Sequence, residues 1–428
     1  MMMSKIIELI QSEMKPSMGC TEPVAIGLAV SRTCEYLNRP ATKLEVHISS
    51  NIFKNAYSVM IPNAGRPGIE QACALGYLLH KPGDTMELFS GVTEELVEKA
   101  EELVTNGFVD IHVIHSSQFY IEVYAMNEAE RAHTITIDKH DNMVKAEKDG
   151  IVLLDAEKDL AAAESAEEFD IQQYGIADFV RWAEDVEVEQ ITFLKDAVDM
   201  NLNISKRGME KKYALGIGPN LQMLQSKGLL GNDLVTEVKK TVAAACDFRM
   251  SGGNGAVMTV LGSGNQGIEI LLPAAVTAKW LGCSDEKMMR AEMISILITM
   301  YLKKYVGRLS PICGAALAGA GSSGAITWLL GGGIKEISGA VQNMLGSLTG
   351  MLCDGAKGGC ALKLAACAGE AVYSAYYAME GSIIQDTDGI ISTRAEDTAK
   401  NVAVLSTEGM ANMDSKIIEV MLQKKCNE

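Results

Sequence analysis

The sequence is poor in aromatic residues, because Phe, Trp and Tyr make up only 5% of its 428 positions. The hydrophobic fraction is nonetheless 48%, so the interior must be built mainly from Ala, Val, Ile, Leu and Met. Small side chains of this kind permit helices to pack closely. Since the chain is longer than one ordinary core requires, we expect two domains.

Positive charge is also scarce, since the formal net charge is -17 at pH 7. Such a chain repels phosphate backbones and anionic lipid, so we expect neither a nucleic acid nor a membrane as a partner. Residues 309–334 imitate a membrane span, because they hold no charged residue and exceed the roughly 20 residues that a span needs. The many Gly and Ser residues of this segment lower its hydropathy, and we interpret it as a buried helix followed by a loop.

A secretion signal is not visible, because Lys5 and Glu8 interrupt the amino terminus and no apolar run with a small-residue cleavage site follows. We therefore expect a cytoplasmic protein whose ten cysteines are reduced thiols, available as core residues, nucleophiles or metal ligands. Repeats of fixed period and low-complexity tails are lacking as well, which excludes solenoids and disordered regulators.

The hydrophobic pattern changes along the chain. Residues 1–40 predict two helices joined by a cysteine-bearing turn, with a break at residues 15–19. Alternating hydrophobicity then predicts strands at residues 43–49, 57–61, 110–115, 119–126 and 133–137. Helices are expected among them at residues 68–79 and 93–106. The acidic, Ala-rich residues 155–189 predict surface helices that connect two parts of the molecule.

Beyond about residue 199 the chain becomes rich in Ala, Gly, Leu and Met, which predicts a mostly buried helical bundle. The whole pattern indicates an α+β fold. In this fold, residues 1–40 and 200–428 form a mostly helical, Gly/Ala-rich catalytic domain. An α/β domain of residues 41–199, which includes the connecting acidic helices, is inserted into it.

The first motif that can carry chemistry is Met-Gly-Cys-Thr-Glu-Pro at residues 18–23. Thr21 is suited to cap a helix and Pro23 to its first turn, so the Cys20 thiol is expected beside a helix N-terminus. Partial positive charge there favours a thiolate, which makes Cys20 a candidate base or nucleophile. The alternative is a small side chain packed in a tight turn.

The second motif is Gly-Ser-Gly-Asn-Gln-Gly at residues 262–267. Its glycines let backbone N–H groups surround an anion, and Asn265 and Gln266 add neutral donors suited to a carboxylate. The spacing also fits a dinucleotide-binding loop, but we expect no strand before it and see no later ribose-binding acid. A plain loop between buried helices is the remaining alternative.

The third motif consists of Cys313 and the segment Cys-Asp-Gly-Ala-Lys-Gly-Gly-Cys at residues 353–360. Cys353, Cys360 and Cys367 recur every seven residues, which would form one apolar stripe on a continuous helix. The intervening glycines favour a loop that bends around a cluster. Thiolates select zinc or iron-sulfur, and zinc is the weaker choice because paired Cys-x-x-Cys ligands are lacking. Three ligands would leave an iron open to act as a Lewis acid in an elimination.

Taken in order, these motifs resemble the L-cysteine desulfidase family and, more distantly, the alpha chain of iron-sulfur L-serine dehydratases. The resemblance covers nearly the whole chain, including Ser-Ser-Asn-Ile-Phe-Lys-Asn at residues 49–55 and the extension of the third motif to Lys363. It departs from the serine dehydratases at Gly355, where their Cys-Asp pair is followed by Pro. Cysteine is therefore the favoured substrate.

The resemblance implies a [4Fe-4S] cluster held by Cys313, Cys353 and Cys360, with Cys20 as the catalytic base and no pyridoxal phosphate. The implied reaction is the α,β-elimination of L-cysteine to pyruvate, ammonia and hydrogen sulfide.

Our hypothesis for the small amino-acid substrate is that its carboxylate is held by the loop of Asn265 and Gln266, helped by Lys54 or Lys357. L-Serine dehydratase and a non-enzymatic iron-sulfur sensor are the alternatives. A homo-oligomer is compatible with the sequence.

Overall fold

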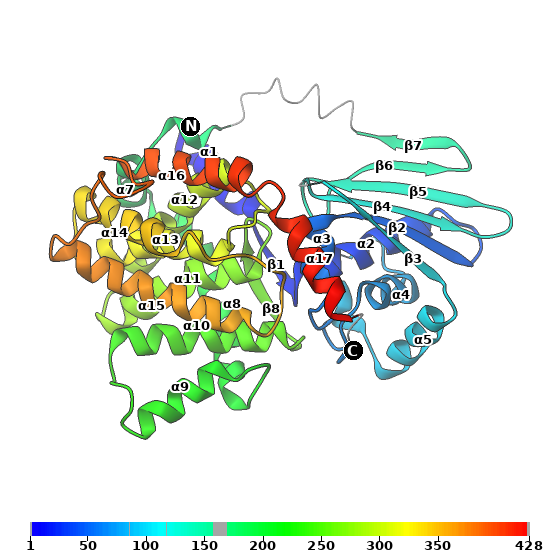
Figure 1. Cartoon of the computed structure of the whole chain (residues 1–428), viewed down its shortest axis with the longest axis horizontal. Coiled ribbons are helices and arrows are strands. Elements are labelled where there is room, and N and C mark those ends of the chain that lie inside the picture. Colours follow the sequence, from blue (N-terminus) through cyan, green and yellow to red (C-terminus); the bar gives the residue numbers. More distant parts are fainter. Residues whose placement is uncertain (1, 85, 117, 157–168, 426–428) are drawn as a thin grey trace.

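The computed structural model describes residues 2–84, 86–116, 118–156 and 169–425. A large helical part and a smaller part built on a sheet lie side by side (Figure 1). The expected α+β class, with helix predominating, is confirmed. In the described residues, no helix combines the length and the apolar character needed to cross a membrane.

The smaller part is a six-stranded sheet with helices packed on one face. Its strand order is β3-β2-β4-β5-β6-β7; β2 and β3 are parallel and the other neighbours are antiparallel. The strands are β2 (Lys43–Ser49), β3 (Val109–Ile114), β4 (Tyr120–Met126), β5 (Arg131–Ile137), β6 (Met143–Lys148) and β7 (Ile151–Asp155). The helices are α2 (Thr21–Glu35), α3 (Ser50–Ala56), α4 (Ile69–Leu79) and α5 (Glu94–Thr105).

Alternation along β2 decides which face of the sheet is covered. Leu44, Val46 and Ile48 are fully buried and pack in one cluster with residues of α2, such as Ala25 and Ile26. The residues between them point to the opposite face, because side chains alternate along a strand. The uncovered face of the sheet is therefore polar.

The larger part is a helical bundle that surrounds α13. Its helices are α1 (Met2–Glu13), α7 (Ile176–Asp185), α8 (Phe193–Glu210), α9 (Ile217–Ser226), α10 (Leu234–Met250), α11 (Gly264–Trp280), α12 (Asp285–Val306), α13 (Gly314–Leu329), α14 (Ile334–Leu348), α15 (Cys360–Met379) and α16 (Ala395–Val404). The last helix, α17 (Met413–Lys425), leaves the bundle and packs on α3 of the smaller part.

Helix α13 contacts α11, α12, α14 and α15 (Figure 1). A Cβ on Gly321 would lie 2.5 Å from the backbone oxygen of Ser295 in α12, so these two helices approach too closely for any larger residue. The interpretation of residues 309–334 as a buried helix and a loop is confirmed, since α13 ends at Leu329 and a glycine turn follows.

Two strands of the larger part were not predicted. β1 (Met14–Met18) pairs antiparallel with β8 (Ala256–Val260), with Met14 opposite Val260. The expected break between two helices at residues 15–19 is present, since α1 ends at Glu13 and α2 begins at Thr21, but β1 occupies it. The expectation of no strand before the glycine loop at residues 262–267 was wrong. The partner strand lies far away in the sequence, so a local pattern could not reveal the pairing.

The strand expected at residues 57–61 is also wrong. Tyr57 still has helical backbone angles after α3, and only an isolated bridge between Met60 and Pro67 forms in this region. The expected connecting helices at residues 155–189 fall partly on residues 157–168, which lie outside the described residues. In the remainder, α7 packs Phe179 and Trp182 into the core of the helical part.

The predicted domain boundaries, residues 1–40 with 200–428 and residues 41–199, stay a prediction. In the structure, α2 contacts α4 and β4 of the smaller part, whereas α7 and α8 contact α12 of the larger part.

Candidate active site

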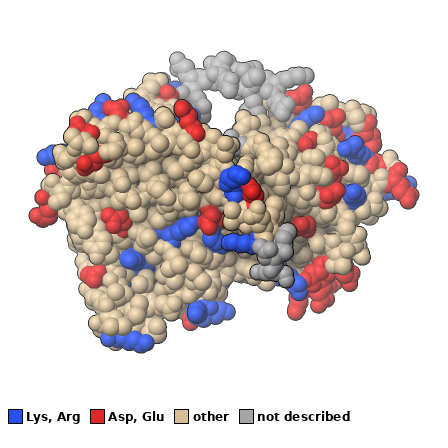
Figure 2. Space-filling view, viewed as in Figure 1, with Lys and Arg blue, Asp and Glu red and all other residues tan. Residues whose placement is uncertain are grey.

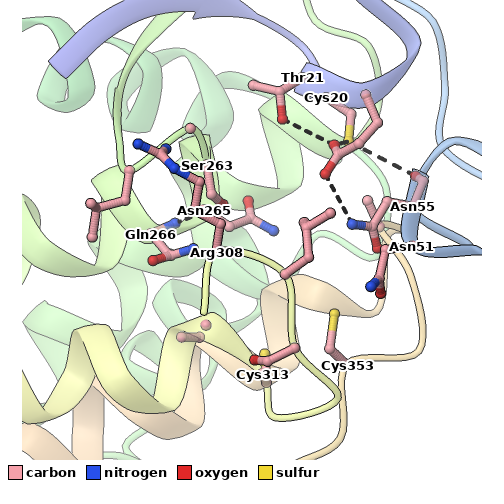
Figure 3. Close-up of a pocket in the computed structure, with 18 of the residues that line it drawn as sticks. Cys20, Thr21, Asn51, Asn55, Ser263, Asn265, Gln266, Arg308, Cys313 and Cys353 are labelled. Atoms are coloured by element: carbon pink, nitrogen blue, oxygen red, sulfur yellow. Dashed lines mark hydrogen bonds between the residues drawn. The ribbon is translucent and has the colours of Figure 1, made fainter. Parts of the chain in front are cut away.

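A cavity of about 100 Å³ lies where the two parts meet. It is lined by the start of α2, by α3, by the glycine loop before α11, by the segment before α13 and by the loop before α15 (Figure 3). Cys20, Asn265, Gln266, Cys313, Cys353 and Cys360, which are far apart in the sequence, all line it. The fold therefore brings the three predicted motifs to one place.

Four helices begin at this cavity. Cys20 is the N-cap of α2, Ser263 that of α11 and Cys313 that of α13, while Cys360 is the first residue of α15. The N-terminus of a helix carries partial positive charge and free N–H groups, so each of these ends favours a nearby anion. The cavity is thereby suited to negative groups such as thiolates, sulfide or a carboxylate.

Backbone pairing brings Cys313 and Cys353 together. Ile312 and Leu352 form an isolated antiparallel bridge, in which the Cys313 N–H donates to Met351 O at 2.8 Å and the Cys353 N–H donates to Pro311 O at 2.7 Å. Burial and then the neighbouring Cys353 raise the pKa of the Cys313 thiol to about 12. Burial therefore disfavours the thiolate form of Cys313.

The loop from Cys353 to Cys360 depends on Gly355. This residue has φ +94°, and a Cβ on it would lie 2.3 Å from the backbone oxygen of Lys54 in α3. Cys360 lies nearby, with its thiol 3.8 Å from Gly355 O. Because α15 begins only at Cys360, the alternative of one continuous helical stripe through Cys353 is excluded.

Cys20 belongs to a buried hydrogen-bond network with Glu22. The Cys20 thiol donates to Glu22 Oε2 at 3.0 Å, the Thr21 hydroxyl donates to the same oxygen at 2.9 Å, and Asn55 Nδ2 donates to Oε1 at 2.9 Å (Figure 3). Glu22 is 7% exposed. Burial opposes its ionisation, but His140 and the three donors together lower the pKa of Glu22.

Two expectations about Cys20 need correction. Thr21 does not cap α2; Cys20 occupies the cap position and the Thr21 hydroxyl binds Glu22. The expected thiolate is also wrong for the resting site, because burial and then the charge of Glu22 raise the pKa of Cys20 well above its ordinary value. The thiol is therefore the favoured form of Cys20 beside the Glu22 carboxylate.

Cationic side chains line the cavity from the helical part. Arg249 is 3% exposed, and its Nη1 donates to Asn265 Oδ1 at 2.9 Å. Lys303 is 4% exposed; burial lowers its pKa to about 8, against the attraction of Cys353 and Cys313. On the face seen in Figure 2, Lys and Arg side chains gather near the junction of the two parts, although the net charge of the chain is -17. The cavity is therefore a cationic region of an acidic protein.

Of the residues predicted to bind substrate, some line the cavity and one does not. Gln266 lies over Gly314, where a Cβ would meet its Nε2 at 2.8 Å, and its Oε1 has no hydrogen-bond partner among the described residues. Lys54 lines the cavity, but its ammonium pairs with Asp414 of α17 at 2.5 Å. Lys357 is not among the residues found to line the cavity, and its ammonium pairs with Asp354.

Comparison with known proteins matches residues 84–419 to the family described as serine dehydratase alpha chain. The chain belongs to the serine dehydratase alpha-chain family. The resemblance inferred from the sequence motifs is confirmed at this level.

Relatives in this family extend over the whole length of the chain. The chain is 38% identical over 427 residues to a UPF0597 protein of Clostridium botulinum, a match that covers 99% of this chain and 97% of the relative. It is 37% identical over 423 residues to a UPF0597 protein of Clostridium perfringens, with 98% of each covered. A UPF0597 protein of Caldanaerobacter subterraneus is 37% identical over 424 residues, again with 98% of each covered.

Several residues of this candidate site were missed from the sequence. Glu22 had a detectable signal, since it stands two positions after Cys20 in the same motif. His140, Arg249 and Lys303 had none, because each comes from a stretch without unusual composition and reaches the cavity only through the fold. His140 is half-buried; its Nε2 is shielded from solvent and has no hydrogen-bond partner among the described residues.

Proposed function

We propose that this chain is an iron-sulfur-dependent lyase that eliminates the side chain of L-cysteine to give pyruvate, ammonia and hydrogen sulfide. The observation that carries the proposal is the convergence of three cysteines, a buried Cys20–Glu22 pair and four helix N-termini on one cationic cavity. Membership of the serine dehydratase alpha-chain family supports a lyase. We expect the enzyme to act in the cytoplasm.

Cys313, Cys353 and Cys360 would hold the cluster, which we take to be [4Fe-4S]. Members of this family usually bind an iron-sulfur cluster. Among the described residues, the three sulfur atoms do not all lie within 4.8 Å of one another, whereas one zinc ion with bonds of about 2.3 Å would need them about 3.8 Å apart. Thiolate donors without paired Cys-x-x-Cys ligands fit an iron-sulfur cluster better than a structural zinc ion. When bound, it supplies a Lewis acid that polarises the leaving group.

The proton of the substrate Cα is taken by Cys20 in this proposal. Because Cys20 rests as a thiol, it must first lose its own proton, and Glu22 Oε2 at 3.0 Å is placed to accept it. Glu22 is thus a carboxylate that activates Cys20. Thr21 and Asn55 hold this carboxylate in place, and neither can take the proton from the thiol.

The substrate carboxylate would bind at the N-terminus of α11. Asn265, fixed by Arg249, and Gln266 supply side-chain amides there, and Ser263 caps the helix. Charge neutralisation of the carboxylate by Arg249 makes the Cα proton more acidic. Lys54 contributes a second cation at the cavity wall, whereas Lys357 would require a different loop conformation.

The remaining steps need water only. As the Cα–H bond breaks, its electron pair forms the C=C bond of aminoacrylate and the Cβ–S bond breaks, so sulfide leaves with the bonding electrons and takes up a proton. Aminoacrylate then tautomerises to an imine, and one water converts the imine to pyruvate and ammonia. No oxidant and no pyridoxal phosphate take part.

L-Serine is the second candidate substrate, favoured because the chain belongs to the family described as serine dehydratase alpha chain. The chemistry would be identical with water in place of sulfide as the leaving group. Pyruvate release from cysteine and from serine, measured side by side on one preparation, distinguishes the two.

Replacement of single cysteines tests the proposal. Cys313→Ala, Cys353→Ala and Cys360→Ala should each lose iron and turnover. As controls, Cys34→Ala and Cys73→Ala remove thiols buried in the cores of the smaller part and should keep both. Retention of iron and turnover in all three of the first variants would contradict the proposal.

A further inference from the structure

A second cluster of metal-ligating side chains lies on the uncovered face of the sheet, separate from the cavity. It consists of Glu45 and His47 of β2 and His112 of β3. His47 and His112 are register partners on two parallel strands, and Glu45 precedes His47 by two positions, so all three side chains project from one face. Three of the six histidines in the chain, His47, His112 and His133, lie on this face.

The distances suit a single metal ion. His47 Nε2 lies 2.7 Å and His112 Nε2 lies 4.0 Å from Glu45 Oε1, and the two imidazoles stack with centroids 4.7 Å apart. One ligand atom from each residue lies within 4.8 Å of the others. A tetrahedral zinc ion with bonds of about 2.0–2.1 Å needs separations of about 3.3 Å, which small side-chain rotations achieve.

We propose that Glu45, His47 and His112 form a binding site for a divalent transition metal of the zinc class. Two imidazoles and one carboxylate are a donor set that selects such ions over Mg²⁺ or Ca²⁺, which prefer oxygen ligands alone. The side chains are 31%, 24% and 46% exposed, in that order, so solvent reaches the site and water can occupy a fourth position. Asp110 Oδ2 lies 3.5 Å from His112 Nε2, so a second carboxylate borders the site.

The position of the site links it to the cavity. β2 ends at Ser49, and α3 begins at Ser50 and carries Lys54 and Asn55, which line the cavity. A metal ion bound by residues of both β2 and β3 would link these two parallel strands, and β2 leads directly into α3. The binding site itself does not depend on the proposed lyase function.

His133 on the same face serves as a matched control. Both of its ring nitrogens already face carboxylates, Nε2 with Glu122 at 2.8 Å and Nδ1 with Glu147 at 3.2 Å. Since His133 is 12% exposed and neither nitrogen is free, it should not bind the added metal.

The test is a Zn²⁺ titration of the purified chain with isotope-labelled histidine, followed by NMR, because imidazole signals do not report zinc bound at cysteines. We expect one equivalent of Zn²⁺ to shift the signals of His47 and His112 and to leave His133 unchanged. His47→Gln and His112→Gln should each weaken Zn²⁺ binding by about 100-fold, as measured from the signal of the site histidine that remains. His133→Gln should leave the affinity unchanged. Unshifted His47 and His112 signals at saturating Zn²⁺, or equal binding in all three variants, would overturn the proposal.

Discussion

Glu22 is the residue on which the proton chemistry of the site depends. It is a buried carboxylate that accepts hydrogen bonds from Cys20, Thr21 and Asn55, and its pKa is held below its ordinary value although burial opposes this. The raised pKa of Cys20 and the lowered pKa of Glu22 describe one pair, in which the proton rests on sulfur. A base that rests protonated needs an acceptor, and Glu22 is the group that lies within hydrogen-bond distance.

Glu22→Gln should therefore keep the size of the side chain and lose its proton acceptor. We expect turnover to fall by about 10² to 10⁴-fold, as for a lost general base, while the iron content stays unchanged. Glu35→Gln, which removes an exposed carboxylate from the other end of α2, should leave both unchanged.

A second comparison separates this role from a structural one. Because Cys20 and Glu22 act as a unit, Cys20→Ser together with Glu22→Gln should lower turnover little more than either change alone. Additive losses in this cycle, or near-normal turnover of Glu22→Gln with iron retained, would show that Glu22 only fills space.

At the scale of elements, the loop between Cys353 and α15 is shaped by Gly355. Its positive φ and its close approach to the Lys54 backbone leave no room for a side chain. Gly355→Ala should shift the loop and lose most of the iron. Gly381→Ala is the control: it also has positive φ, at +77°, but nothing lies within 4 Å of the added carbon, so it should cost about 1 kcal/mol and keep the iron. Equal iron contents in the two variants would contradict this account.

The sheet should respond to acid through Glu122. The hydrogen bond from His133, together with that from Tyr124, lowers the pKa of Glu122 to about 2, although burial opposes this. A carboxylate with a lowered pKa contributes stability above its ordinary pKa near 4.5, and that contribution is lost as the pH falls toward 2.

Urea unfolding between pH 7 and pH 3 measures this effect. The free energy of unfolding of the parent chain should exceed that of Glu122→Gln at pH 7, and this difference should shrink as the pH falls. Glu128 is exposed, so Glu128→Gln should have the same free energy of unfolding as the parent at every pH. A constant difference between parent and Glu122→Gln over the whole range would contradict the assignment.

Elements differ in how well the sequence predicted them. β2, β4, β5, α4 and α5 lie within a few residues of their predicted bounds, because each has a strong local hydrophobic period. β1 and β8 were missed, since each is short and gains its hydrogen bonds only from the other.

Residues of the site were likewise predicted where a local motif marks them and missed where only the fold brings them to the cavity. The cysteine motifs could be recognised from their glycines, whereas His140, Arg249 and Lys303 contribute through tertiary placement alone.

At the scale of the whole molecule, α17 fastens the carboxy-terminal end of the chain to the smaller part. Lys54 of α3 is 1% exposed and pairs with Asp414 of α17, which is 14% exposed. Removing one partner of a buried ion pair leaves an uncompensated charge, which costs about 3–5 kcal/mol. Asp414→Asn should therefore lower the thermal midpoint and raise KM, since Lys54 lines the cavity.

The control for this prediction lies on the same helix. Lys416 and Glu419 form an ion pair that is 72% and 51% exposed, so Glu419→Gln should leave the midpoint and KM unchanged. A midpoint of Asp414→Asn equal to that of Glu419→Gln would mean that the Lys54–Asp414 pair does not hold the two parts together.

The central claim is that the three convergent cysteines hold an iron-sulfur cluster that serves an elimination. The most direct measurement is anaerobic purification followed by iron and sulfide analysis and by pyruvate release from L-cysteine on the same sample. The account predicts brown protein with about four irons and about four inorganic sulfides per chain, and pyruvate and sulfide formed in equal amounts. Colourless protein that holds one zinc ion and turns over cysteine at full rate would contradict it.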